Sequence, residues 1–73
     1  METTGNTKSV SVPIWEQYTL TVEEAAKYFR IGENKIRNLI RQNERANYIL
    51  WDGSHARIKR KLFEQFIDGT SAI

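Results

Sequence analysis

The sequence predicts a small α+β domain, a winged helix-turn-helix with two short helices, a β-hairpin wing and a C-terminal helix. A capping-box motif opens an apolar-periodic segment at residues 21–29, and a second such segment follows Gly32. The hairpin signal Asp52-Gly53 then lies between two runs of β-forming residues. A chain of 73 residues has room for one hydrophobic core and none for a deep enclosed active site.

The first helix is expected to begin after Thr21, whose hydroxyl can accept from the backbone amide of Glu24 while the Glu24 side chain reaches back. Its apolar positions recur at helical spacing and define one face. Gly32 is expected to supply the backbone freedom of the turn that follows. The residues of the apolar face are Val22, Ala25, Ala26 and Phe29.

The second helix is expected from Glu33 or Asn34 to about Gln42, with an apolar stripe of Ile36, Leu39 and Ile40. The opposite face and its flanks carry amides and cations with no acid in the middle. Asn can pair with adenine and Arg with guanine in the major groove, and Arg and Lys also neutralise phosphates. The pattern predicts a DNA recognition helix, although a solvated cationic face has the same composition. The candidate DNA-binding residues on this helix are Asn34, Lys35, Arg37, Asn38 and Arg41, and Arg45 follows on the same side.

The hairpin is expected to pair residues 48–51 with residues 56–59, through a loop of two residues (52–53) or four (52–55). Either loop places four apolar residues on one face and the basic residues on the other. A basic hairpin beside a recognition helix can follow the DNA backbone or enter the minor groove. A charged edge strand that resists aggregation is the alternative reading. The apolar face is Ile49, Trp51, Ala56 and Ile58, and the candidate DNA-binding residues here are Ser54, His55, Arg57, Lys59 and Arg60.

The last helix is expected from about Arg60 to Ile67, ending at Gly69. Its apolar side chains should dock on the domain, and we expect Trp15 and Tyr18 to pack there too, because large aromatics are costly to leave in water. The expected organisation is a flexible N-terminal tail at 1–11, a DNA-binding domain at 12–69 and a C-terminal tail at 70–73.

The net charge of +2 does not by itself indicate a nucleic-acid binder, but the distribution of charge is uneven. From Lys35 to Lys61 there are eight basic residues and two acids. The absence of cysteine excludes disulfides and thiolate ligands and fits a reducing compartment. We find no signal peptide and no apolar run of about 18 residues, so a cytoplasmic protein with no membrane partner is expected.

Catalysis is not predicted. His55 is the only histidine, and no cluster of metal-ligating residues lies near it in sequence. Its neighbours Asp52 and Ser54 are turn residues, which cannot form a catalytic triad with it through adjacency alone. We therefore expect neither an enzyme nor a cofactor nor a metal.

The stretch from Pro13 to Arg37 resembles the excisionases of conjugative transposons. Asp52-Gly53 and the run from Ile58 to Glu64 are similar to the same family, so that the resemblance covers about residues 12–68. It implies a recombination directionality factor that binds near the ends of an integrated element, bends the DNA and assists a tyrosine-family integrase in excision. Such factors often bind as several copies. By this similarity, positions 34, 35, 37, 38 and 41 belong to the recognition helix and residues 52–57 to the wing.

The sequence leaves two alternative functions open. MerR-like regulators share the architecture, so a small transcriptional regulator fits the same residues. Those regulators usually add a long dimerisation helix and an effector domain, for which this chain is too short. The second alternative is a protein-interaction module in which the cationic face meets an acidic partner.

Overall fold

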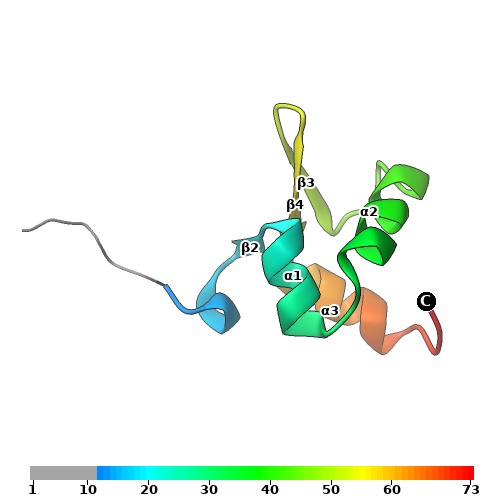
Figure 1. The fold of residues 1–73 in the computed structure, drawn as a ribbon, viewed down its shortest axis with the longest axis horizontal. Helices are drawn as coiled ribbons and strands as arrows, with labels where there is room; N and C mark the ends of the chain where they lie inside the picture. Colours follow the sequence, from blue (N-terminus) through cyan, green and yellow to red (C-terminus); the bar gives the residue numbers. More distant parts are fainter. Residues whose placement is uncertain (1–11) are drawn as a thin grey trace, which may run out of the picture.

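The computed structural model describes residues 12–73, so the tail expected at 1–11 lies outside the described residues. The fold is α+β, as predicted, and the hairpin projects from a group of helices like a wing (Figure 1). The elements in chain order are the 3₁₀ turn η1 (Ile14–Glu16), β2 (Thr19–Leu20), α1 (Val22–Phe29), α2 (Glu33–Gln42), β3 (Ile49–Asp52), β4 (His55–Lys59) and α3 (Arg60–Asp68).

Within residues 12–73 the strands form one antiparallel sheet in the order β2-β4-β3. The hairpin was expected, but β2 was not, since two residues are too short to show an alternating pattern. Thr19 pairs with Lys59 and Leu20 with Ile58, which covers the outer edge at the base of β4. The backbone amide of Arg60 also donates to the carbonyl of Tyr18 at 3.1 Å. The segment before the first helix is therefore tied to the wing.

The hairpin has the register of the longer predicted loop. Ile49 lies opposite Ile58 and Trp51 opposite Ala56, so these four side chains share a face as predicted. One further pair, Asp52 with His55, shortens the loop to residues 53–54. The two-residue loop at 52–53 was wrong, because the positive φ of +64° at Gly53 suits the first central position of a type II′ turn.

The turn between α1 and α2 departs from expectation in one residue. The capping box is present as predicted: the amide of Glu24 donates to the Thr21 hydroxyl, and the Glu24 carboxylate accepts from the Thr21 amide. The left-handed residue that ends α1, however, is Arg30 (φ 59°), while Gly32 has an ordinary φ of −60°. A Cβ at Gly32 would meet no atom within 4 Å, so neither turn nor packing requires glycine there.

The core lies where both helices, the sheet and α3 meet. Phe63 of α3 is fully buried and makes edge-on aromatic contacts with Phe29 of α1 and Tyr48, at centroid distances of 4.8 and 4.9 Å. The apolar stripes predicted for the helices and for the hairpin all contribute to it. The buried apolar residues among those described are Leu20, Val22, Ala25, Ile36, Ile40, Tyr48, Ile49, Ile58 and Phe63.

The expectation that Trp15 and Tyr18 pack on the domain was wrong. Trp15 is 63% exposed and Tyr18 is 73% exposed. A single 3₁₀ turn followed by a two-residue strand offers few inward positions, and here Ile14 and Leu20 take them. Two large aromatic side chains are therefore left at the surface beside β2.

Replacement of Arg30 by glycine is expected to stabilise the protein by up to about 1 kcal/mol. The left-handed conformation costs a non-glycine residue about 1–2 kcal/mol, which glycine avoids. Glycine is more flexible in the unfolded chain, however, and the entropy it loses on folding cancels roughly half of that gain. Urea unfolding measures the difference. The matched control is Gly53→Ala, where glycine already holds a positive φ and the sign should reverse. A destabilised Arg30→Gly protein would contradict the geometry of this turn.

Tyr48→Phe is expected to leave stability at pH 7 unchanged or raise it by up to about 1 kcal/mol. The Tyr48 hydroxyl is buried and has no hydrogen-bond partner among the described residues, so its removal leaves no group newly unpaired. Burial also raises the pKa of Tyr48 above its ordinary value of 10.0. The stability that this shift contributes is complete below pH 10 and is lost as the pH rises through the folded-state pKa.

Urea unfolding of both proteins at pH 7 and above pH 10 tests this prediction. The wild-type chain should lose more stability at alkaline pH than the phenylalanine variant. Equal alkaline losses would mean that Tyr48 ionises as freely in the folded protein as in the unfolded one.

Candidate nucleic-acid interface

Helix α2 presents a polar face whose orientation is set by the core. Ile36 and Ile40 are buried, so the opposite side of the helix faces solvent. All five candidate residues of this helix are exposed. The structure thus brings Asn34, Lys35, Arg37, Asn38 and Arg41 together on one accessible surface.

The three cations of this surface have partners in the folded chain. Arg41 Nη2 donates to Asn38 Oδ1 one helical turn earlier. Lys35 Nζ donates to the main-chain oxygen of Ile73 at 3.1 Å, which brings the C-terminal segment beside α2. Arg37 Nη2 lies 3.3 Å from a carboxylate oxygen of Glu23 and 3.3 Å from one of Glu33.

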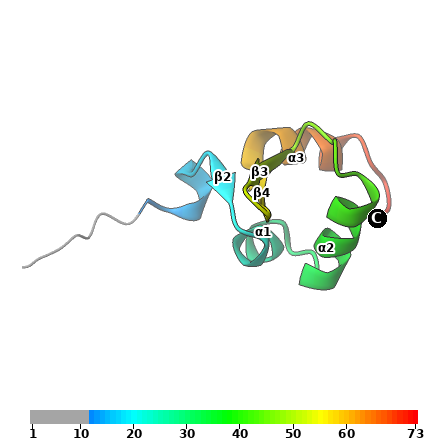
Figure 2. The same ribbon diagram turned by 90° about the horizontal axis from the view of Figure 1, so that it is seen from above.

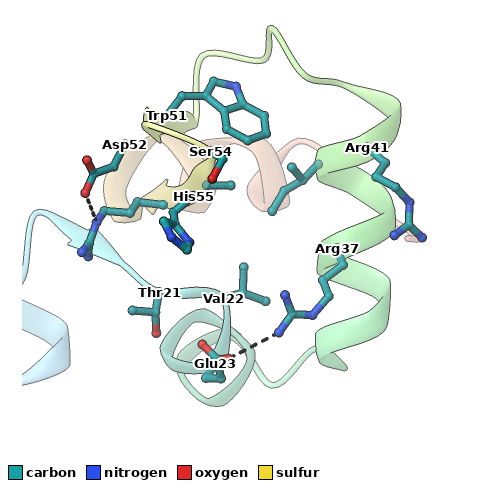
Figure 3. Close-up of a pocket in the computed structure, with 12 residues that line it drawn as sticks. Thr21, Val22, Glu23, Arg37, Arg41, Trp51, Asp52, Ser54 and His55 are labelled. Atoms are coloured by element: carbon teal, nitrogen blue, oxygen red, sulfur yellow. Dashed lines mark hydrogen bonds and ion pairs between the residues drawn. The ribbon is translucent and has the colours of Figure 1, made fainter.

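An open groove of about 560 Å³ separates α2 from the hairpin. Figure 3 shows Trp51 and His55 of the hairpin on one side of it and Arg37 of α2 on the other, with the start of α1 below and the Arg41 guanidinium turned away from the hairpin. Apolar atoms of Val22, Ile40 and Ala56 also line the groove, and charged groups surround them. The full lining is Thr21, Val22, Glu23, Arg37, Ile40, Arg41, Trp51, Asp52, Ser54, His55, Ala56 and Arg57.

Trp51 forms one wall of this groove. Its indole Nε1 donates to the backbone carbonyl of Glu44 at 2.9 Å, which satisfies the polar edge of the ring. The side chain is still 44% exposed, so part of the apolar ring is available in the groove. The sequence assigned Trp51 mainly to the core, because it lies on the apolar face of the hairpin. In the structure it lies two residues beyond the buried Ile49 toward the tip, past the edge of the core.

The wing residues divide into two groups. Ser54 and His55 are exposed at the tip, and Arg57 lies with its Nε 3.5 Å from Asp52 Oδ2 across the strands. These residues line the groove. Lys59 is half-buried at the base of the hairpin, on the sheet face shared with Arg57, and does not line the groove.

Arg60 is held inside the domain. Its side chain is 12% exposed, its Nε donates to the carbonyl of Gln17 at 2.9 Å and its Nη1 to Glu64 at 3.1 Å. The guanidinium also lies over the Tyr28 ring, 6.0 Å from its centroid. Because these contacts join α3 to the segment before β2, we assign Arg60 a structural role and leave it out of the proposed DNA surface.

Two acids of this surface were not predicted from the sequence. Glu33 precedes Arg37 by one helical turn, and that spacing was a readable signal. Glu23 lies on the other helix, so no sequence spacing connects it to Arg37. The pKa of Glu23 is held below its usual range, chiefly by a hydrogen bond from its own backbone amide and further by Arg37 and the Thr21 hydroxyl. Glu23 is therefore ionised at neutral pH.

No group of three or more His, Cys, Asp or Glu in residues 12–73 is placed to hold a metal ion. In the same part of the chain, no helix has both the length and the apolar character needed to cross a membrane.

Comparison with known proteins identifies the family. Residues 4–73 match the family model described as "Excisionase from transposon Tn916". A curated protein of the same description, from Streptococcus agalactiae serotype V (strain ATCC BAA-611 / 2603 V/R), is 56% identical over 66 residues, which cover 90% of this chain and 98% of the relative. The resemblance drawn from the sequence is thus confirmed, and the chain belongs to the Tn916 excisionase family of accessory recombination factors, which are not enzymes.

Proposed function

We propose that this chain acts in recombination by binding duplex DNA near the ends of a mobile element, bending it and directing a tyrosine-family integrase toward excision. Family membership supports the role of a recombination directionality factor. The observation that carries the DNA contact is the exposed amide and guanidinium face of α2, separated from a projecting hairpin by an open groove.

In this proposal α2 occupies the major groove. Its ten residues span about 15 Å and present Asn38 and, in the last turn, Arg41 on the exposed face. An α-helix fits the major groove of B-DNA, where arginine reads guanine and asparagine reads adenine. The bond between Asn38 and Arg41 is exposed, so its exchange for contacts to bases costs little.

The hairpin would then lie against the backbone or the adjacent minor groove. Ser54, His55 and Arg57 are the residues of the tip and arm that face the groove with α2. A DNA strand that separates a major from a minor groove would pass between α2 and the hairpin. Phosphates would meet the charged rim, and sugar rings would meet the apolar atoms of Trp51 and Ala56.

Bending DNA requires contact energy that one small domain does not readily supply. Smoothly bending a site of 20–30 base pairs costs about 1–6 kcal/mol, which the contacts of α2 and the hairpin must offset. We therefore propose that several copies bind adjacent sites and share this cost. Because the target DNA of such an element is cytoplasmic, the proposed role also places the protein in the cytoplasm.

A gel-shift titration tests the proposal. The probes are duplexes from both ends of the element that carries this gene, the gene's own promoter and an unrelated duplex, at near-physiological salt with competitor DNA. Stepwise shifts on the end fragments alone support the proposed role, and circular permutation of those fragments measures the bend. A shift of the promoter alone would favour a transcriptional regulator. Absence of any specific shift would favour the protein-interaction alternative.

Arg41→Ala is expected to weaken specific binding by about 10- to 100-fold, because a two-pronged arginine contact with guanine is worth roughly 1–3 kcal/mol. Fluorescence anisotropy on the end-fragment duplex measures the loss. Gln65→Ala, a change at an exposed position of α3 outside the groove lining, serves as the control and should have little effect. Unchanged affinity of Arg41→Ala would remove Arg41 from the recognition surface.

Lys59→Ala is expected to weaken binding to all duplexes alike and to reduce the slope of log affinity against log salt by roughly one unit. The physical reason is the loss of one phosphate-neutralising cation on the basic face of the hairpin. Affinities at four or more salt concentrations give the slope. An unaltered slope would show that the base of the hairpin stays off the phosphates.

A further inference from the structure

Arg37 differs from the other arginines of the proposed DNA surface because it is neutralised from two sides. Glu23, at the start of α1, and Glu33, at the start of α2, both contact its Nη2 at 3.3 Å. Both pairs are exposed to solvent. Figure 3 shows the Arg37 guanidinium turned toward Glu23 at the edge of the groove.

Both acids contact the same nitrogen of Arg37, Nη2, and this limits what the guanidinium can bind. A guanidinium grips guanine or a phosphate through two parallel N–H groups, supplied by Nη2 together with either Nε or Nη1. Nη2 carries two N–H groups, and it already faces two carboxylate acceptors. Both possible two-pronged arrangements therefore need Nη2 to release at least one carboxylate.

Arg41, one helical turn away on the same surface, provides the contrast. Its Nη2 donates to the neutral amide oxygen of Asn38, and no described carboxylate forms an ion pair with it. Its charge is thus available to any phosphate. Arg57 is intermediate, since a single carboxylate, that of Asp52, pairs with it, with Oδ2 3.5 Å from Nε.

We propose that Glu23 and Glu33 compete with DNA for Arg37 and so limit the affinity that this arginine contributes. Arg37 completes a two-pronged contact only on DNA that places a guanine or phosphate well enough to displace the carboxylates. On an unrelated duplex the ion pairs stay closed, so the cost of opening them falls on the matched site. This inference rests on the DNA binding proposed above and adds an internal competitor for one of its contacts.

The small energy of these ion pairs favours competition with DNA over a rigid support of Arg37 by the two acids. Exposed ion pairs of this kind are weak, so a well-placed DNA acceptor can replace them. A displaced carboxylate remains near the phosphates and repels them, which adds to the cost of opening the pairs. Glu23 stays ionised at neutral pH, so the competitor is present under working conditions.

The double variant Glu23→Gln with Glu33→Gln tests the inference. Glutamine keeps the size of each side chain and removes its charge. Affinity for the end-fragment duplex should rise about 5- to 10-fold, as expected when two exposed pairs no longer have to open, while affinity for an unrelated duplex should rise no more than about twofold. Any two such changes raise the net charge by two, so the control is the double variant Glu16→Gln with Asp68→Asn, at exposed positions of η1 and α3, which should change neither affinity by more than about twofold.

A second comparison assigns the effect to Arg37. In an Arg37→Ala background the two glutamines should give little or no gain on the end-fragment duplex, because the competition no longer exists. Thermal unfolding by circular dichroism shows whether each variant is folded at the assay temperature, since both acids also lie in first turns of helices.

The outcomes separate this inference from the proposed function. A gain that is larger on the end fragment than on the unrelated duplex and that depends on Arg37 supports the inference. Three results would overturn it: a loss of affinity on the end fragment alone, which would make the acids supports for Arg37; a gain that persists without Arg37; or no change in either affinity. Failure of the unmodified protein to bind any duplex would instead refute the proposed DNA binding.

Discussion

Burial of Phe63 is the interaction on which the rest of the structure depends. This side chain lies on α3, and its ring contacts Phe29 of α1 and Tyr48 at the start of the hairpin. The last helix is thereby packed under both the helix-turn-helix and the wing (Figure 2). Small domains bury a limited fraction of their surface, so one shared aromatic cluster has to hold all the elements together. The distance between α2 and the hairpin, and hence the groove, follows from this packing.

The cationic surface is more selective than the sequence count of basic residues indicates. Arg60 is held in the contact between α3 and the segment before β2 and is largely shielded from solvent. Arg37 and Arg57 are paired with acids, and Arg41 is paired with a neutral amide. Equal formal charges therefore have unequal access to a phosphate, because local partners differ.

Much of the site followed from periodicity and local motifs. The helical spacing of Ile36 and Ile40 predicted which face of α2 is exposed, and hence the five polar residues on it. The capping box placed the start of α1, and pairing of Ile49 with Ile58 followed from strand alternation and the turn signal. Trp15 and Tyr18 were misjudged because hydrophobic character predicts a preference for burial and not whether an inward position exists for the side chain.

The sequence by itself determined the order and type of the main elements, the faces of its helices and hairpin, and its family, because these depend on residues close together in the chain. Only the tertiary structure decided that Thr19–Leu20 joins the sheet, that Trp51 lines a groove and that Glu23 meets Arg37. Each of these contacts joins residues on different elements. Their distances are set by how α1, α2 and the hairpin pack on α3, and no local spacing encodes that packing.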